Sequence, residues 1–231
     1  MAPLAFPAPQ AATPSDDPCR SPRDLEALLG IGITAERAAG QTIIVEGDPR
    51  THGFRVLTGA VRLYKALPDG RRQVLDFLTQ GGCFGLFGAG HYAYSVEAIV
   101  PSALARYPRA NLEAALRANP EVALRLLDAA RSELEQAQVH MLLLGRKTAE
   151  EKVAAFLVIF ADRLGSRAAD AVVLRLPMTR QDMADYLGLT IETVSRTLTR
   201  LRQEGLITLA SPQDVIVRRR VALEALAHAS A

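Results

Sequence analysis

The sequence predicts an α+β fold that consists of an antiparallel β-roll, one long helix and a C-terminal winged helix-turn-helix. Short β-like runs separated by turn residues fill residues 40–104. Apolar residues then recur at spacings of three and four residues from 122 to 144, the pattern of a helix that pairs with another helix. Two N-cap residues flank a glycine turn between 179 and 190, which indicates two short helices that cross. We therefore expect four segments: a flexible tail at 1–20, a β-roll at 21–119, a dimerisation helix at 120–145 and the winged domain at 146–231.

The composition is that of an ordinary globular chain. Of its 231 residues, 49% are hydrophobic and 23% are charged, with a formal net charge of +2, so wholesale disorder is excluded. The longest apolar run, residues 153–161, is far shorter than the roughly 18 to 20 residues of a transmembrane helix. The first basic residue is Arg20, unlike a secretory signal, and we expect a cytoplasmic protein. Cys19 and Cys83 alone make neither a disulfide framework nor a four-cysteine metal site.

The first half of the chain begins with a proline-rich stretch that cannot bury a core. Five of the first 20 residues are proline, and Ser21 and Pro22 then suit the start of a short helix that ends at Gly30. The expected strands lie at 42–45, 54–57, 60–67, 74–78 and 95–100. Their regular spacing with tight turns indicates an antiparallel roll. Five glycines between 81 and 90 favour a tight corner, with a ligand-binding loop as the alternative.

A long helix is expected after a short one at 110–118. The helix at 121–144 would be about 36 Å long, more than a small roll can cover, so we expect it to dimerise. The alternative is an amphipathic helix that packs only on its own roll. The predicted dimer seam consists of Val122, Leu126, Ala130, Leu134, Ala137, Met141 and Leu144.

The C-terminal part carries the most specific local signals. We expect a helix at 148–164, a loop at 166–170, a strand at 172–176 and a β-hairpin, the wing, formed by 207–209 and 215–217. Between them, Thr179 caps one helix, small Ala184 permits a close crossing, Gly188 makes the turn and Thr190 caps the second helix. The predicted buried stripe of the second helix is Ile191, Val194, Leu198 and Leu201.

The outer face of the second helix has the chemistry for reading double-stranded DNA. Arg196 can bond guanine O6 and N7, Glu192 can accept a hydrogen bond from cytosine N4, and Ser195 can contact a thymine edge. The alternative, a surface ion pair between Glu192 and Arg196, would contribute only about 0.2 to 0.5 kcal/mol. A basic patch surrounds this face: Arg196, Arg200, Arg202, Arg218, Arg219 and Arg220 outnumber Glu204 and Asp214. The candidate phosphate contacts are Thr179, Arg180, Gln181, Thr190, Thr193 and Arg200.

The order of the three parts resembles the CRP/FNR superfamily of bacterial transcription regulators, over about residues 22 to 220. Residues 144–156, which read LGRKTAEEKVAAF, and residues 191–196, which read IETVSR, are most similar to the FixK branch of the FNR/FixK group. The resemblance implies a cyclic-nucleotide-binding-like jelly roll and a homodimer on a TTGAT-N4-ATCAA-like palindrome, with half-sites about 34 to 36 Å apart. It also implies an activator of low-oxygen or anaerobic metabolism genes that needs no small effector and contacts RNA polymerase. Loops 68–72 and 165–170 are the candidate polymerase contacts by that analogy.

The chain departs from the relatives that sense ligands. Cyclic-nucleotide-binding members carry Gly-Glu-Leu and Arg-Ser or Arg-Thr, whereas here Leu86 follows Gly85 and Tyr94 precedes Ser95, so we expect no cyclic nucleotide. Two cysteines cannot build the four-cysteine cluster of FNR. The four histidines show no ligand spacing, so we expect no metal or cofactor: His52, His91, His140 and His228. The open alternatives are a ligand, haem or thiol switch in the roll and, from another class, a cupin-like enzyme, which the lack of clustered ligands disfavours. We therefore expect a protein that is not an enzyme.

Overall fold

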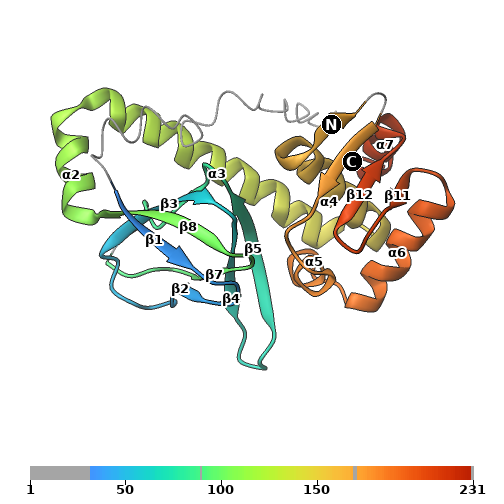
Figure 1. Cartoon of the computed structure of the whole chain (residues 1–231), viewed down its shortest axis with the longest axis horizontal. Helices are drawn as coiled ribbons and strands as arrows, with labels where there is room; N and C mark the ends of the chain where they lie inside the picture. Colours follow the sequence, from blue (N-terminus) through green and yellow to red (C-terminus); the bar gives the residue numbers. More distant parts are fainter. Residues whose placement is uncertain (1–31, 89, 169–170, 230–231) are drawn as a thin grey trace, which may run out of the picture.

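The computed structural model describes residues 32–88, 90–168 and 171–229. A β-roll lies at one end of the molecule, a mixed C-terminal domain lies at the other, and one long helix connects them (Figure 1). The predicted tail, the helix expected before Gly30 and Cys19 lie outside the described residues. The α+β class and the order of the three parts are as the sequence predicts.

The roll is built from two four-stranded antiparallel sheets. Their strand orders are β1-β8-β3-β6 and β2-β7-β4-β5, and β-branched and aromatic residues such as Val56, Phe84 and Val96 fill the space between them. All five predicted strands are confirmed, but β1, β6 and β8 were not predicted, and β8 extends the sheet region to Pro108. The strands are β1 (Ile33–Arg37), β2 (Thr42–Ile44), β3 (His52–Thr58), β4 (Ala60–Ala66), β5 (Arg72–Thr79), β6 (Cys83–Phe84), β7 (Ser95–Ala98) and β8 (Ser102–Pro108).

Two helices follow the roll. α2 (Arg109–Ala118) leads through Asn119 into α3 (Pro120–Arg146), whose N-terminus is fixed because the Asn119 side chain accepts a hydrogen bond from the Glu121 backbone N–H at 3.1 Å. Proline at the first helical position adds to this start. At 27 residues, α3 is about 40 Å long and continues past the roll to the C-terminal domain, as Figure 1 shows.

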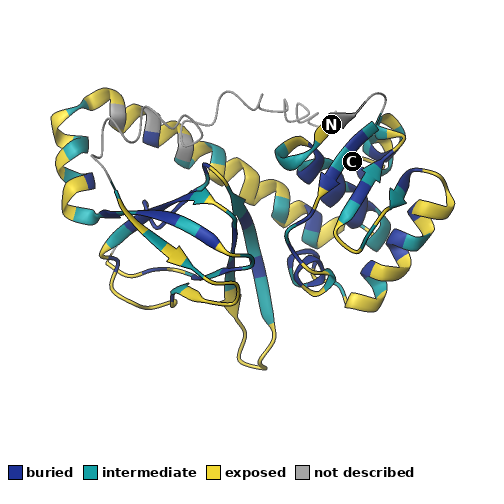
Figure 2. Cartoon of the chain, viewed as in Figure 1, coloured by how far each residue is buried: buried dark blue, intermediate teal, exposed yellow. Residues whose placement is uncertain are grey.

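α3 presents two different apolar faces, and this corrects one residue of the predicted seam. Leu126 is only 6% exposed because it packs against Tyr107 and Leu112 of its own chain, so it cannot lie in an open seam. Its neighbour Leu127 is 66% exposed instead. Figure 2 shows an exposed band along much of α3. Among the described side chains of this helix, the large apolar ones that are exposed are Leu124, Leu127, Leu134, Val139, Met141 and Leu142.

The other predicted seam residues behave differently along the helix. Ala130 is partly buried and Ala137 is exposed, and Leu144 packs partly against the core of the C-terminal domain. The side chain of Val122 lies outside the described residues. The exposed positions 127, 134 and 141 are one heptad apart, and they define the face that a partner helix could cover.

The C-terminal domain packs helices against a small antiparallel sheet of order β11-β12-β10-β9. Thr148 and Glu151 form a capping box that begins α4 at the predicted position. The expected loop at 166–170 is partly wrong, because residues 166–168 pair with β10 as a short edge strand. The final helix was not predicted. The elements are α4 (Ala149–Leu164), β9 (Ser166–Ala168), β10 (Ala171–Arg175), α5 (Arg180–Leu187), α6 (Ile191–Gln203), β11 (Ile207–Leu209), β12 (Asp214–Val217) and α7 (Arg220–Ala227).

The roll and the C-terminal domain share one apolar cluster. Phe77 of β5 lies 5.9 Å from the ring of Phe160 in α4 and 5.7 Å from that of Tyr186 in α5, measured between centroids. From α3, His140 stacks on Tyr186 at 4.0 Å, and its Nε2 lies 2.8 Å from the Tyr186 backbone oxygen. Burial lowers the pKa of His140, so the fold favours its neutral ring. These contacts place α5 directly against β5.

Candidate nucleic-acid interface

The helix-turn-helix forms where the sequence predicts it, because each local signal is satisfied by a contact. Thr179 Oγ1 accepts a hydrogen bond from the Asp182 backbone N–H at 3.1 Å, and the Asp182 carboxylate accepts one from the Thr179 N–H at 3.0 Å. Gly188 ends α5 with a φ of +61°, a conformation that costs other residues free energy. Thr190 Oγ1 then accepts from the Thr193 N–H at 3.3 Å and begins α6.

The inner face of α6 corrects one predicted core residue. Val194, Leu198 and Leu201 are fully buried in the domain core, as predicted. Ile191 is 37% exposed instead, because it begins the helix outside this cluster. It lies at the open N-terminal end of α6 beside Glu192, where an apolar side chain can contact a thymine methyl group. The sequence did not indicate a DNA contact for Ile191, because its spacing from Val194, Leu198 and Leu201 is that of the buried stripe.

The outer face of α6 exposes the three side chains expected to read bases. Glu192, Ser195 and Arg196 are all solvent-exposed on the first two turns. Arg196 Nη2 donates a hydrogen bond to Thr193 Oγ1 at 3.4 Å, and within the described part of the chain it forms no ion pair with Glu192. Hydrogen bonds from its own backbone N–H and from the Thr190 hydroxyl lower the pKa of Glu192, with a smaller effect of Arg196. Glu192 is therefore a carboxylate at neutral pH, and most Arg196 donors remain open.

Five of the six candidate phosphate contacts gather at the N-termini of the two helices. Thr179, Arg180 and Gln181 begin α5, and Thr190 and Thr193 begin α6. Backbone N–H groups at a helix N-terminus favour an anion such as phosphate. Arg180 is partly buried against Met183, and this desolvation lowers its pKa, although a guanidinium stays charged.

The sixth candidate, Arg200, lies apart from the others. It is about 14 Å along α6 from Ile191, and its guanidinium pairs with Glu150 at 3.1 Å and Glu204 at 3.0 Å. Arg220 of the predicted basic patch is also paired, with Asp162 at 2.5 Å and with Glu224 at 2.7 Å. Because these carboxylates offset the charges of Arg200 and Arg220, the positive potential of the basic patch is lower than the six arginines in the sequence suggest.

The predicted wing is present as the β11–β12 hairpin. Its strands pair in antiparallel register, from Ile207 opposite Val217 to Leu209 opposite Val215. Arg218 follows β12, is exposed, and donates to Thr208 Oγ1 at 3.3 Å. Arg202 and Arg219 are exposed as well. Together with Arg196, these three arginines form the open part of the basic patch.

The glycine-rich corner of the roll is closely packed. Gly85 has a φ of +70°, and a Cβ atom there would lie 3.1 Å from the Tyr92 ring. The Gly85 N–H donates to the Tyr94 hydroxyl at 3.0 Å, and the Arg50 guanidinium donates to the backbone oxygen of Leu86 at 2.6 Å. Leu86 is buried in an apolar cluster. These two hydrogen bonds and the close packing agree with the interpretation of this segment as a tight corner.

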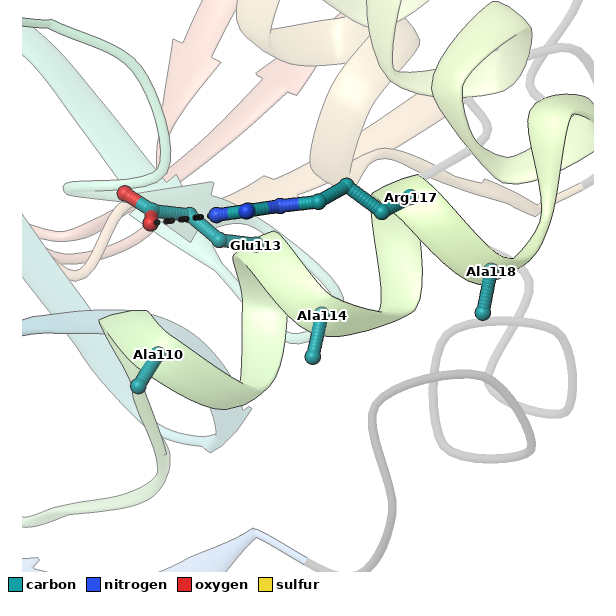
Figure 3. A pocket seen from close by; sticks show the side chains of 5 residues that line it. All are labelled: Ala110, Glu113, Ala114, Arg117 and Ala118. Carbon is teal, nitrogen blue, oxygen red and sulfur yellow. Dashed lines mark hydrogen bonds and ion pairs between the residues drawn. The ribbon is translucent and has the colours of Figure 1, made fainter.

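One hollow on the described surface is lined by a single helix face. A hollow of about 560 Å³ lies on the outside of α2, lined by three alanines and by the ion pair of Glu113 and Arg117 (Figure 3). A ligand site normally encloses its ligand among several convergent polar groups, which this single helix face lacks. Among the described residues, no three histidine, cysteine or carboxylate side chains come together as metal ligands. None of the described helices has the length and hydropathy needed to span a bilayer.

Comparisons with known proteins agree with this architecture. Residues 151–226 match the family model of the Crp-like helix-turn-helix domain, and residues 35–119 match that of the cyclic nucleotide-binding domain. The nitrogen fixation regulation protein FixK of Bradyrhizobium diazoefficiens is 42% identical over 80% of this chain and 78% of its own. The transcriptional activatory protein AadR of Rhodopseudomonas palustris is 44% identical over 90% of this chain and 87% of its own.

Solved structures show the same relationship. FixK2 from Bradyrhizobium japonicum superimposes with a TM-score of 0.82 at 39% identity, covering 87% of this chain and all of that chain. A CooA mutant from Carboxydothermus hydrogenoformans has a TM-score of 0.75 at 20% identity, over 87% of this chain and 90% of that chain, and so shares the fold. The chain therefore belongs to the CRP/FNR superfamily, as a FixK/FNR-type transcription regulator with a DNA-binding helix-turn-helix, and not to a family of enzymes.

Proposed function

We propose that the protein is a homodimeric activator that binds a TTGAT-N4-ATCAA-like palindrome without a small effector and controls genes of low-oxygen or anaerobic metabolism. The observation that carries this proposal is the exposed triplet Glu192, Ser195 and Arg196 on the first turns of α6. The FixK relatives are named as regulators of nitrogen fixation, and we infer the low-oxygen setting from the resemblance of this chain to their branch. As part of this proposal, the protein acts in the cytoplasm, where it would meet DNA.

The triplet matches the donors and acceptors of a TTGAT half-site. The Arg196 fork can bond O6 and N7 of the guanine, and the ionised Glu192 can accept from the N4 amino group of the cytosine paired with it. Ser195 and the exposed Ile191 can contact thymine edges. Phosphates on either side would bond to the helix N-termini at Thr179 and Thr190. Readout and positioning thus come from one end of the helix-turn-helix.

The exposed face of α3 supports a homodimer. Leu127, Leu134 and Met141 recur every seven residues, and Ala130 and Ala137 lie between them at the complementary spacing. Leaving these leucine and methionine side chains in water is unfavourable, and a second copy of the helix would bury them symmetrically. Two copies would present two recognition helices, as a palindrome requires.

The packing of the roll supports action without an effector. Where cyclic-nucleotide binders of this superfamily carry glutamate and arginine, this chain has buried Leu86 and a Tyr94 whose hydroxyl bonds the Gly85 N–H. The match to the cyclic nucleotide-binding family is therefore attributed to the shared fold. Cys83 is buried, which disfavours a thiol switch because oxidants react with exposed thiolates.

Activation at a promoter would also need contact with RNA polymerase. The β4–β5 hairpin projects away from the roll, and its turn exposes the ion pair of Asp69 and Arg71 (Figure 1). We assign the polymerase contact to residues 68–72 and 165–170, of which 169 and 170 lie outside the described residues. A dimer bound across the promoter itself would instead repress.

Base substitutions in the duplex test this function. Replacing the guanine of one TTGAT half-site should weaken binding of the wild-type protein by about 1 to 3 kcal/mol, because the Arg196 fork loses both acceptors. Replacing the four central base pairs should have a much smaller effect. Fluorescence anisotropy at one fixed salt concentration measures both, since phosphate contacts make every affinity depend on salt. Equal losses in the half-site and the centre would refute the proposed readout.

A further inference from the structure

A network of ion pairs joins the roll to the first helix of the helix-turn-helix. Arg62 of β4 donates to Asp182 of α5 at 2.6 Å and also pairs with Glu97 of β7 at 2.8 Å. Arg72 of β5 pairs with the same Asp182 at 2.9 Å and with Asp185 at 2.5 Å. These groups are largely removed from water, and the Asp182 side chain is only 3% exposed. The network, defined by these five residues, therefore lies inside the contact between the two parts.

Only two residues outside a helix join α3 to the C-terminal domain, although His140 and Leu144 of α3 also contact that domain. α3 ends at Arg146 and α4 begins at Ala149, so the covalent connection consists of an extended Lys147 and the cap Thr148. Apolar packing of Phe77 against α5 adds attraction but little directionality. Each planar guanidinium here bonds two different carboxylates at once, which restricts the angle between them as well as the distance. The network is thus suited to set the orientation of α5, and with it that of α6.

The network also ends on the proposed DNA-facing side of α5. Asp182 accepts a hydrogen bond from the Thr179 hydroxyl at 2.7 Å and completes the capping box of the helix. Asp185 accepts one from the Gln181 side chain at 2.7 Å. Thr179 and Gln181 are proposed phosphate contacts, so the roll is connected to the DNA-facing end of α5 through two hydrogen-bonded carboxylates.

We propose that Arg62 and Arg72, acting through Asp182 and Asp185, are positioning residues that fix the distance and rotation between the two recognition helices of the dimer and so select the spacing of the half-sites. This inference rests on the proposed binding to a palindrome. One extra base pair moves a half-site by about 3.4 Å and turns it by about 35°. A rigidly held domain cannot follow that displacement, whereas a domain released from the roll can.

The test compares spacers of three, four and five base pairs between TTGAT half-sites, using Arg72→Gln and Asp185→Asn. Arg71→Gln is the matched control, because Arg71 lies next to Arg72 but pairs only with Asp69 of its own turn among the described residues. Wild type and control should prefer the four-base-pair spacer strongly. Both network variants should lose about tenfold of this preference, equivalent to about 1.4 kcal/mol, while affinity for a single half-site stays within about twofold.

The two variants change net charge in opposite directions, so a shared loss of spacing preference cannot arise from charge alone. Thermal unfolding and the dimer mass confirm that each variant is folded. Unchanged spacing preference in both folded variants would overturn the inference, as would a control that changes as they do. If the wild-type protein binds none of the TTGAT duplexes, the proposed function is wrong. That result is obtained before any variant is compared, so it is distinct from a failure of the inference about spacing.

Discussion

Arg196→Ala is expected to weaken binding to the TTGAT palindrome by about 1 to 3 kcal/mol per half-site, which is roughly five- to more than hundredfold for each. The physical reason is that Arg196 is exposed on the second turn of α6, bonds only weakly to Thr193, and has donors left for guanine. The variant should also lose its discrimination at that position and bind a guanine-substituted duplex almost as well as the original. Fluorescence anisotropy with both duplexes measures the two effects together.

The matched control is Arg202→Ala. Arg202 is also exposed on α6 but lies in its last turn, away from the bases. This variant should weaken binding to all duplexes by the same factor, and that factor should be smaller than the loss caused by Arg196→Ala. It should also reduce the salt dependence of binding, as expected for a phosphate contact or a longer-range charge. Equal behaviour of the two arginine variants, or unchanged selectivity of the Arg196 variant, would contradict the assigned readout.

Leu134→Glu is expected to convert the dimer to a monomer. Leu134 lies at the centre of the exposed heptad positions of α3 and is 59% exposed in the single chain, so the substitution should be tolerated before association. In the dimer, two carboxylates would become buried in the seam without partners, at a cost of several kcal/mol. Affinity for the palindrome should then fall about 10²- to 10⁴-fold, because the second half-site is no longer bound intramolecularly.

Sedimentation velocity gives the mass of this variant, and anisotropy gives its affinity. Leu142→Glu is the control, because Leu142 is 63% exposed on the same helix but lies one residue after Met141, outside the heptad seam. It should remain dimeric and bind normally. A dimeric Leu134 variant with wild-type affinity would show that another surface forms the dimer.

The helix-turn-helix and the wing could be predicted almost residue by residue, because their signals are local. Caps at Thr179 and Thr190 and the turn at Gly188 each depend on neighbours within four residues. β1 was missed because its residues are mostly exposed and lack an apolar alternation. The choice between Leu126 and Leu127 for the seam could not be made from spacing, since it depends on which face of α3 the roll covers.

The contact between the roll and α5 could not be predicted from sequence at all. Arg62 and Asp182 are 120 residues apart, and no pattern around either residue identifies the other as its partner. The pairing of Arg200 with Glu150 could not be predicted for the same reason, because the two residues are far apart in the sequence. This ion pair reduces the positive charge available to DNA. By contrast, the absence of the charged residues of a cyclic-nucleotide site could be read directly from the sequence, because Leu86 and Tyr94 stand in their places in short motifs.

The central claim is specific DNA binding without an effector, and one measurement tests it most directly. Purified protein, free of metal and ligand and kept in air, is titrated onto a TTGAT-N4-ATCAA duplex, with a scrambled duplex as reference at the same salt concentration. We expect specific binding in the range of about 10⁻⁸ M or tighter, unchanged when cyclic nucleotide, haem or a thiol reductant is added. Binding that remains at the level of the scrambled duplex until one of these is supplied would contradict the claim and identify the roll as a sensor.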